Sequence, residues 1–427
     1  MRKKEHFGVT ILRKKQAILV IADGMGDRPN EELNYQTPLE YANTPNMDAL
    51  VSLGACGNVH PYQPGIRVGT DVGHLAIFGY DPKEVYKGRG PIEAYSGGLE
   101  LEDGDIAFRG NFASVDDDFK VLDRRAQRIT VGTKELAAAI NGLKLKDGTL
   151  ILAKELTAHR VAIVLRGKDL STNITETDPG TTQDGQPLLK PKPLKDSESA
   201  HKTAQLVWEL TKSIYVLLSA HPINKRRTKE GKLPANMIIL RGVGGKNSMD
   251  PISKICHIKC ACIAGDLTVH GIAKMAGMDL YAEEEFTGGL DTNYIGKANL
   301  AIKLLQKGYD WIIVHVKAPD LAGHDNLPWK KVEIASKIDQ MIGHLMKSVD
   351  LQKCYLSYTS DHSTPCQLGD HSGDPVPTII AGSDVIKDSV VKTGESFFIN
   401  GSLNNLKAND IFRIQMDLMG ASKKYGA

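Results

Sequence analysis

The chain has 427 residues, of which 41% are hydrophobic and 24% charged, proportions typical of a folded globular protein. Its 53 Lys and Arg against 51 Asp and Glu leave a net charge of +2, which argues against nucleic acid or a membrane surface as a partner. Six unevenly spaced cysteines make no disulfide framework, no apolar run is long enough to cross a bilayer, and the N-terminus lacks an apolar secretion signal. We therefore expect a cytoplasmic protein that binds a small molecule; its oligomeric state is left open.

The first part of the chain has the pattern of an α/β domain. Residues 1–15 are rich in Lys and Arg and form a predicted basic N-terminal extension. The apolar run Gln16–Ala22 predicts a strand that ends in Asp23-Gly24. A helix is predicted after Thr44-Pro45, and a Gly-rich stretch continues to residue 96.

The middle and the last part of the chain differ in character. Residues 97–228 have strands of their own at 149–153 and 160–165 and helices at 134–140 and 199–219. After residue 229 short apolar runs alternate with helices, which is typical of βα units in one mostly parallel sheet. These runs are 236–241, 256–264, 310–316, 354–359 and 376–381, with a helix at 295–307. Cys256, Cys260 and Cys262 do not have zinc-hook spacing and are interpreted as part of a core strand.

These patterns predict an α/β protein of two domains, because the chain exceeds the roughly 250–300 residues at which one hydrophobic core stops growing. The sheet-forming domain comprises residues 16–96 and 229–427. A smaller domain, residues 97–228, is inserted into it.

Carboxylates and imidazoles follow three of the predicted strands. They are Asp23, then Asp320 and His324 in Ala-Pro-Asp-Leu-Ala-Gly-His, then Asp361 and His362 in Ser-Asp-His-Ser, with His371 shortly after. The carboxyl ends of parallel strands meet at one edge of a sheet, where α/β proteins place their sites. Mixed Asp and His ligation suits Mn²⁺ or Zn²⁺ better than Ca²⁺. The sequence therefore predicts a two-metal centre; the alternative is a set of ordinary turn aspartates and surface histidines.

Thr70 is the candidate nucleophile. It follows Gly69 and precedes Asp71, where a helix is predicted to begin, so its hydroxyl could meet a phosphate at the positive end of that helix. Taken alone, the segment is more typical of a helix cap than of a nucleophile. Nearby metal ions favour the nucleophile, because they activate a hydroxyl at neutral pH.

Arginines are dense in the predicted inserted domain. Asp123, Arg124, Arg125 and Arg128 lie together, and Arg160 and Arg166 stand at the two ends of one predicted strand. Guanidinium groups bind phosphate and carboxylate bidentately, which indicates a small, doubly anionic substrate. For any single arginine a solvated surface position is the alternative, and Asp123 could shuttle protons or pair with arginine.

These residues, in this order, resemble the metal and nucleophile set of the alkaline phosphatase superfamily. More specifically, the chain resembles the archaeal type of cofactor-independent (2,3-bisphosphoglycerate-independent) phosphoglycerate mutase over nearly its whole length after residue 16. Further matching segments are Ile-Phe-Gly-Tyr-Asp-Pro (77–82), Gly-Arg-Gly-Pro (88–91), Ala-Phe-Arg-Gly-Asn-Phe-Ala (107–113), Asp-Arg-Arg-Ala (123–126), Thr-Asp-Pro (177–179), His-Pro-Ile-Asn (221–224), Pro-Ala-Asn (234–236) and Leu-Arg-Gly (240–242).

The resemblance implies an alkaline-phosphatase-like metal domain and an inserted domain that grips substrate. One metal would be held by Asp320, His324 and His371, and the other by Asp23, Asp361, His362 and the oxygen of Thr70. Substrate-binding roles are implied for Arg109, Asn111, Asp123, Arg124, Arg160, Arg166 and Arg241, and catalytic roles for Thr70, Asp123 and Arg241. Two divalent ions are expected, with Mn²⁺ preferred and Mg²⁺, Co²⁺ or Zn²⁺ possible, and no 2,3-bisphosphoglycerate.

The implied reaction interconverts 3-phosphoglycerate and 2-phosphoglycerate, in glycolysis and gluconeogenesis, through a phosphoenzyme. The chain departs from the family at the nucleophile, which is usually serine, because Thr70 carries an additional methyl group. The alternatives are a related metal-dependent phosphomonoesterase or phosphopentomutase-like enzyme, and a catalytically silent metal- or anion-binding homologue.

Overall fold

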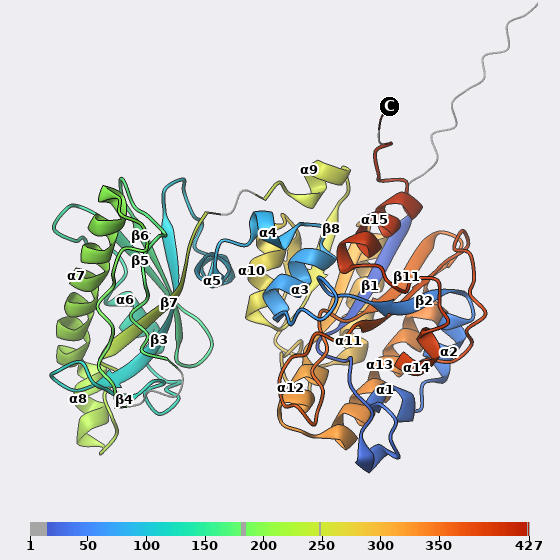
Figure 1. Ribbon diagram of the computed structural model, residues 1–427, viewed down its shortest axis with the longest axis horizontal. Coiled ribbons are helices and arrows are strands. Elements are labelled where there is room, and N and C mark those ends of the chain that lie inside the picture. Colours follow the sequence, from blue (N-terminus) through green and yellow to red (C-terminus); the bar gives the residue numbers. More distant parts are fainter. Residues whose placement is uncertain (1–14, 181–184, 247–248, 425, 427) are drawn as a thin grey trace, which may run out of the picture. The chain divides into compact units, whose positions relative to one another are not determined.

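The computed structural model describes residues 15–180, 185–246, 249–424 and 426 (Figure 1). Apart from Lys15, the predicted basic extension lies outside the described residues. The chain forms two compact units, each continuous in space but not in sequence. The first unit comprises the chain up to Asp81, Asp250–Asp266 and Ala276–Ala427, and the second comprises Pro82–Met249 and Leu267–Met275.

The first unit is built on a seven-stranded sheet in the order β2-β12-β11-β1-β10-β8-β9. β1 lies near its middle, parallel to both β10 and β11, and β8 and β9 continue the parallel part. β12 is antiparallel to both of its neighbours. The predicted mainly parallel sheet is confirmed. The strands are β1 (Gln16–Ala22), β2 (Gly54–Val59), β8 (Cys260–Ile263), β9 (Asp279–Tyr281), β10 (Trp311–Val316), β11 (Cys354–Thr359) and β12 (Val376–Ala381).

Helices cover both faces of this sheet, which is why its central strands are apolar on both sides. Side chains of α2 (Pro45–Val51), α11 (Tyr294–Gln306) and α13 (Pro328–Ser348) pack on Ile18, Val20 and Val314. On the other face, Trp311 meets Phe78, just after α3 (Thr70–Ile77), and Phe412 of α15 (Ala408–Leu418). The remaining helices are η1 (Glu31–Leu33), α1 (Pro38–Tyr41), α9 (Ile252–Cys256), α12 (Ala318–His324) and α14 (Glu395–Phe398). None of the described helices is long and apolar enough to cross a membrane.

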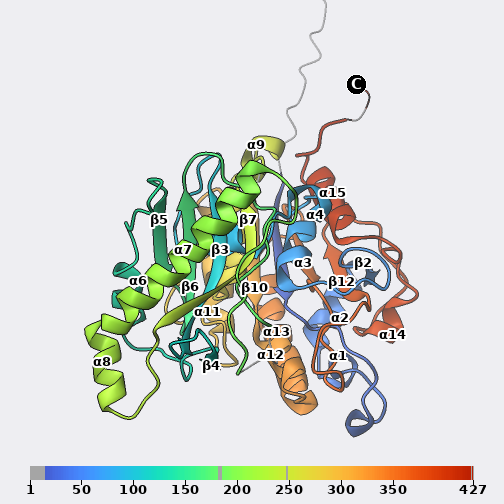
Figure 2. The same ribbon diagram turned by 60° about the vertical axis from the view of Figure 1, so that its left-hand side comes forward.

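The second unit contains a five-stranded sheet in which every described pairing is antiparallel. Alternate residues of β3 point to opposite faces, so Phe108 and Phe112 join the apolar core under α7 while Arg109 and Asn111 point away from it. In Figure 2, α7 crosses this sheet. The elements are β3 (Ile106–Val115), β4 (Val121–Asp123), β5 (Leu150–Glu155), β6 (Arg160–Arg166), β7 (Met237–Gly245), α4 (Pro82–Val85), α5 (Arg89–Ser96), α6 (Thr133–Ala138), α7 (Glu198–Ala220), α8 (Pro222–Lys229) and α10 (Leu267–Met275).

Two predicted strands differ from the structure. The run 236–241 was assigned to the parallel sheet, but β7 pairs with β3 in the second unit, so this assignment is wrong. The second unit is accordingly wider than the predicted 97–228 at both ends, because α5 also packs against β3 and β6. The run 256–264 is not one strand, since Cys256 ends α9 and the strand begins only at Cys260. An apolar run predicts a strand but not the sheet that the strand joins, because the choice of neighbouring strand depends on contacts distant in sequence.

Glu395 gives the first unit a predictable response to pH. Its carboxylate accepts hydrogen bonds from Thr37 Oγ1 at 2.6 Å and from Asp27 N at 3.3 Å. Burial raises the pKa of Glu395 to about 7. The protonated form is therefore favoured in the folded state, so the stability linked to this group is present below its unfolded pKa and is lost as pH rises through 7.

Replacing Glu395 with glutamine removes this titration. We expect the free energy of unfolding of Glu395→Gln, relative to wild type, to rise by about 1–3 kcal/mol between pH 5 and pH 8. Urea unfolding of the two metal-free proteins at both pH values measures this difference. A difference independent of pH would show that Glu395 is ionised throughout this range.

Candidate active site

The polar residues predicted as metal ligands lie at the carboxyl ends of the three central strands of the first unit. Asp23 follows β1, Asp320 and His324 lie in α12 directly after β10, and Asp361 and His362 follow β11. This is the edge at which parallel sheets place ligands. Asp23, Asp361 and His362 are fully buried. Buried acids and imidazoles at one edge indicate a built site, because such groups are rarely buried without partners.

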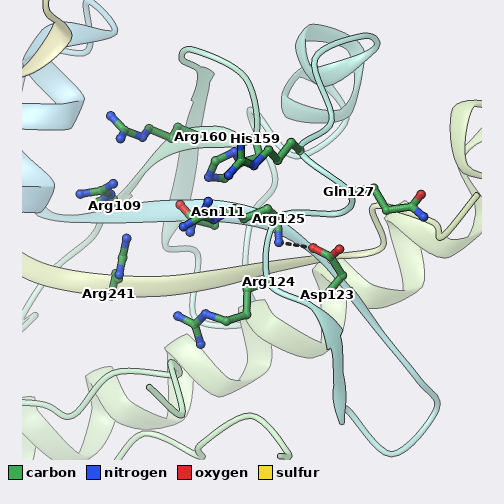
Figure 3. A pocket seen from close by; sticks show the side chains of 10 residues that line it. Arg109, Asn111, Asp123, Arg124, Arg125, Gln127, His159, Arg160 and Arg241 are labelled. Atoms are coloured by element: carbon green, nitrogen blue, oxygen red, sulfur yellow. Dashed lines mark hydrogen bonds between the residues drawn. The ribbon is translucent and has the colours of Figure 1, made fainter. Parts of the chain in front are cut away.

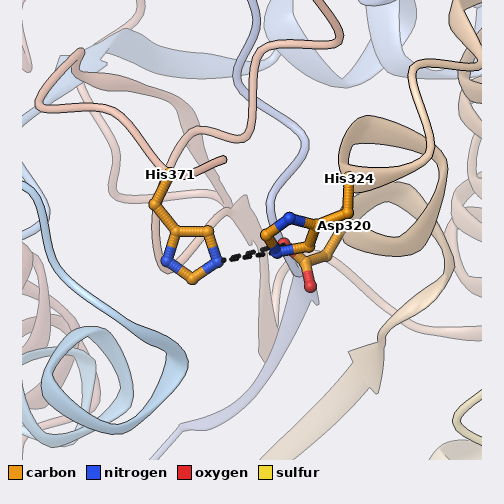
Figure 4. Close-up of side chains that lie close together, drawn as sticks. All are labelled: Asp320, His324 and His371. Carbon is orange, nitrogen blue, oxygen red and sulfur yellow. Dashed lines mark hydrogen bonds and ion pairs between the residues drawn. The ribbon is translucent and has the colours of Figure 1, made fainter. Parts of the chain in front are cut away.

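The first cluster consists of Asp320, His324 and His371 (Figure 4). Asp320 Oδ1 lies 3.5 Å from His324 Nε2 and 3.4 Å from His371 Nε2, and the two Nε2 atoms are 3.2 Å apart. Ligand atoms about 2.1 Å from a tetrahedral ion lie about 3.4 Å from one another, so this triangle fits one face of such an ion.

Backbone carbonyls orient both imidazoles of the first cluster. His324 Nδ1 donates to Gly369 O at 3.0 Å, and His371 Nδ1 donates to Val68 O at 2.8 Å. Protonated Nδ1 leaves the lone pair on Nε2 free, which is the arrangement found around metal-bound histidines.

The second cluster gathers around His362. Its Nε2 lies 3.4 Å from Asp23 Oδ1, 3.3 Å from Asp361 Oδ2 and 3.4 Å from Thr70 Oγ1. These distances again match the separation of ligands on one ion. Asp23 and His362 also form a group with Asp320, which therefore belongs to both clusters. Thr70 is the first residue of α3, as predicted.

The charges of this site are compatible with bound divalent cations. Burial, and next the charge of Asp361, raise the pKa of Asp23 well above its usual range. Burial alone would also raise the pKa of Asp320. Hydrogen bonding from His371 and the charges of Lys317 and His362 instead hold this pKa far below its usual range. Mutually repelling buried carboxylates are stabilised by divalent ions, so the residues present fit a metal centre.

Lys317 was not predicted from the sequence. Its Nζ lies 3.0 Å from Asp23 Oδ1, 2.7 Å from Asp320 Oδ2 and 3.1 Å from Thr70 Oγ1. Lys317 directly follows β10, just as Asp23 directly follows β1. This shared position is the feature of the sequence that could have identified Lys317 as a site residue. A cation in contact with the Thr70 hydroxyl favours a negatively charged oxygen there.

Two further buried histidines contact the carboxylates of the site. His315 Nε2 lies 2.9 Å from Asp23 Oδ2, and His74 Nδ1 lies 2.8 Å from Thr70 O and 3.3 Å from Asp361 Oδ2. Such outer contacts set the orientation of ligands. Neither histidine could be distinguished in the sequence from a core residue.

The second unit contains an arginine-rich pocket of about 440 Å³ (Figure 3). It lies on the face of the sheet opposite α7, because Arg109 and Asn111 point away from the core that α7 covers. Six of the seven predicted substrate-binding residues line it, together with Arg125, Gln127, Arg128 and His159. Burial, and next the charge of Arg89, lower the pKa of Arg109 to about 9. The six are Arg109, Asn111, Asp123, Arg124, Arg160 and Arg241.

Arg166 is the exception among the predicted substrate residues. It does not line the pocket, and it forms ion pairs with Glu102 at 2.6 Å and Asp105 at 2.8 Å at the other end of β6. Within the pocket, Arg124 is bound by Asp178 at 2.6 Å, and Arg241 lies 3.8 Å from the same carboxylate. These contacts fix two guanidinium groups before any ligand binds.

Comparison with known proteins agrees with this arrangement. A family model described as 2,3-bisphosphoglycerate-independent phosphoglycerate mutase matches residues 52–224. The 2,3-bisphosphoglycerate-independent phosphoglycerate mutase 1 of Methanocaldococcus jannaschii is 42% identical over 417 residues, covering 97% of this chain and 100% of that protein. The corresponding mutase of Pyrococcus horikoshii is 43% identical over 416 residues, covering 97% and 99%.

Solved structures lead to the same family. A Pyrococcus horikoshii protein has a TM-score of 0.84 and 37% identity, covering 97% of this chain and 100% of its own. The cofactor-independent phosphoglycerate mutase of Thermoplasma acidophilum has a TM-score of 0.72 and 32% identity, covering 95% and 100%. The chain described here belongs to the family of 2,3-bisphosphoglycerate-independent phosphoglycerate mutases.

Proposed function

We propose that the protein interconverts 3-phosphoglycerate and 2-phosphoglycerate without 2,3-bisphosphoglycerate, using two divalent ions and a phosphoenzyme on Thr70. The observation that carries the proposal is the pair of Asp/His clusters, one of which includes the Thr70 hydroxyl. The names of the relatives support the substrate, and the arginine pocket supports a ligand with several negative charges.

The chemistry divides between the residues of the two units. Asp320, His324 and His371 would hold one ion, and Asp23, Asp361 and His362 the other. When bound, the ions would make the Thr70 hydroxyl more acidic and neutralise phosphoryl oxygens; Mn²⁺ is our first choice.

The reaction conserves atoms and charge. Thr70 Oγ1 loses its proton and attacks phosphorus, the bond from phosphorus to O3 of 3-phosphoglycerate breaks, and O3 takes a proton. O2 of the glycerate then gives up a proton and attacks the same phosphorus, the bond from phosphorus to Thr70 Oγ1 breaks, and Oγ1 takes a proton back. Asp123 is a candidate proton carrier, and Arg109, Asn111, Arg124, Arg160 and Arg241 would hold the glycerate.

The direct test is conversion of 3-phosphoglycerate to 2-phosphoglycerate by metal-free protein to which Mn²⁺ is added. We expect turnover that needs Mn²⁺ and is unchanged by 2,3-bisphosphoglycerate. Release of inorganic phosphate in place of 2-phosphoglycerate would indicate a phosphatase instead. Turnover of neither kind, with Mn²⁺ bound, would indicate a silent homologue.

Arg160 and Arg166 provide a matched pair, because they stand at opposite ends of β6. Arg160 lines the pocket, so Arg160→Gln should raise KM for 3-phosphoglycerate about 10- to 100-fold. This is the expected cost of losing one charged hydrogen bond from the protein to the substrate. Arg166 is ion-paired outside the pocket, so Arg166→Gln should change KM less than about threefold. Steady-state kinetics of the two variants measures the difference. Equal effects on KM would show that the pocket does not bind substrate.

A further inference from the structure

The pocket of the second unit contains backbone in an unusual conformation. Ala126, Gln127 and Arg128 have φ angles of 45°, 58° and 54°, so three consecutive residues other than glycine are left-handed. In this conformation Cβ is crowded by the following carbonyl oxygen, and single residues rather than runs adopt it. Such strain persists only where surrounding contacts hold it, and it gathers at binding and catalytic sites. We call residues 126–128 the left-handed turn.

Side chains in and next to the left-handed turn lie either in the apolar core or in the pocket. Ala126 is fully buried and belongs to the apolar core of the second unit. Arg125, Gln127 and Arg128 line the pocket. The turn and the residue before it therefore contribute two guanidinium groups, which match a phosphate or a carboxylate group of a bound ligand.

Arg227 of α8 holds the left-handed turn from outside the pocket. Its Nη2 donates to Ala126 O at 2.9 Å, and its Nε donates to Leu233 O at 3.0 Å. Leu233 N in turn donates to the side chain of Gln127, at 3.2 Å from Oε1. Arg227 does not line the pocket, so these contacts act on the backbone that carries the pocket arginines.

We propose that Arg227 is a positioning residue for the anionic substrate, because it holds the left-handed turn in the conformation that places Arg125 and Arg128 in the pocket. The inference rests on the proposed function and adds a residue to its substrate site. A site whose charged groups are fixed before binding loses less conformational entropy on binding, and so binds more tightly. Without Arg227 the strained turn relaxes, and affinity falls while the chemistry at Thr70 is unaffected.

Three variants test the proposal by kinetics with 3-phosphoglycerate. Arg227→Gln is expected to raise KM about tenfold and to leave kcat within about threefold, because binding is lost and the reacting groups are not. Arg226→Gln is the matched control: Arg226 is the exposed neighbour in α8, and we expect no change. Adding Ala126→Gly to Arg227→Gln should return KM to within about threefold of wild type, because glycine adopts left-handed backbone without crowding.

The rescue separates positioning from a general structural role. Loss of fold in Arg227→Gln would lower kcat and the thermal midpoint and would not be repaired by a glycine in the turn. Unchanged KM in Arg227→Gln, a fall confined to kcat, or no recovery in the double variant would overturn the proposal.

Calorimetric titration of the metal-free proteins with 3-phosphoglycerate keeps this inference distinct from the proposed activity. If the wild type binds and the variants follow the expected order, the role of Arg227 stands even if no mutase activity is found. If the wild type is a mutase and Arg227→Gln binds equally well, the role of Arg227 fails and the activity stands. A wild type that does not bind 3-phosphoglycerate overturns the inference.

Discussion

Thr70→Ala is expected to lower kcat for conversion of 3-phosphoglycerate to 2-phosphoglycerate at least about a thousandfold, with KM changed little. Thr70 Oγ1 lies 3.1 Å from Lys317 Nζ, a cation that favours an anionic oxygen, and 3.4 Å from His362 Nε2 in the second cluster. Alanine keeps the helix start but has no atom that can accept the phosphoryl group. The arginine pocket is unchanged, which is why binding should persist.

Thr70→Ser is the matched control, since it keeps the hydroxyl and removes only the methyl group. We expect kcat equal to or above that of the wild type, because the methyl group crowds the approach to phosphorus. Mass spectrometry of acid-quenched reactions should find a phosphoryl group on the peptide that contains Thr70 in the wild type and none in Thr70→Ala. Full activity in Thr70→Ala would show that the transfer uses another nucleophile or none.

Much of the candidate metal site was predictable because several of its residues share one topological position. Asp23, Asp320 and Asp361 each come after an apolar run, and the carboxyl ends of parallel strands necessarily meet at one edge. Asp23, Asp320 and Asp361 could therefore be grouped before any coordinates, and the structure brings them together around His362. Lys317 shares this position and was overlooked because lysine is not a metal ligand. His74 and His315 carry no such positional signal.

The pocket was less predictable because its shape depends on contacts distant in sequence. The strand at β7 was placed in the wrong sheet, although its local pattern was interpreted correctly, because pairing with β3 is a tertiary choice. Arg124, Arg125 and Arg128 were noted only as neighbours in the sequence, but the backbone of residues 126–128 is left-handed. No residue of 126–128 is glycine, so composition gave no indication of a left-handed conformation; it is held by Arg227, about a hundred residues later in the chain.

Asp320→Asn is expected to have an effect as large as that of Thr70→Ala, for a different reason. Asp320 belongs to both Asp/His clusters, and its carboxylate also pairs with Lys317 at 2.7 Å. Asparagine is isosteric but neutral, so one ion would lose a negative ligand and the other a neighbouring negative charge. We expect kcat/KM with Mn²⁺ to fall at least about a thousandfold and the dissociation constants of both ions to rise at least about tenfold.

Two comparisons make this expectation specific. Asp325→Asn changes an exposed carboxylate at the end of the same helix and should alter neither metal binding nor turnover. His324→Gln changes a residue of the first cluster alone, so it should weaken one ion and leave the other nearly as tight as in the wild type. Metal content after dialysis against graded Mn²⁺ distinguishes these cases. If Asp320→Asn lost only one ion, the carboxylate would serve a single cluster, and the two ions would bind independently of it.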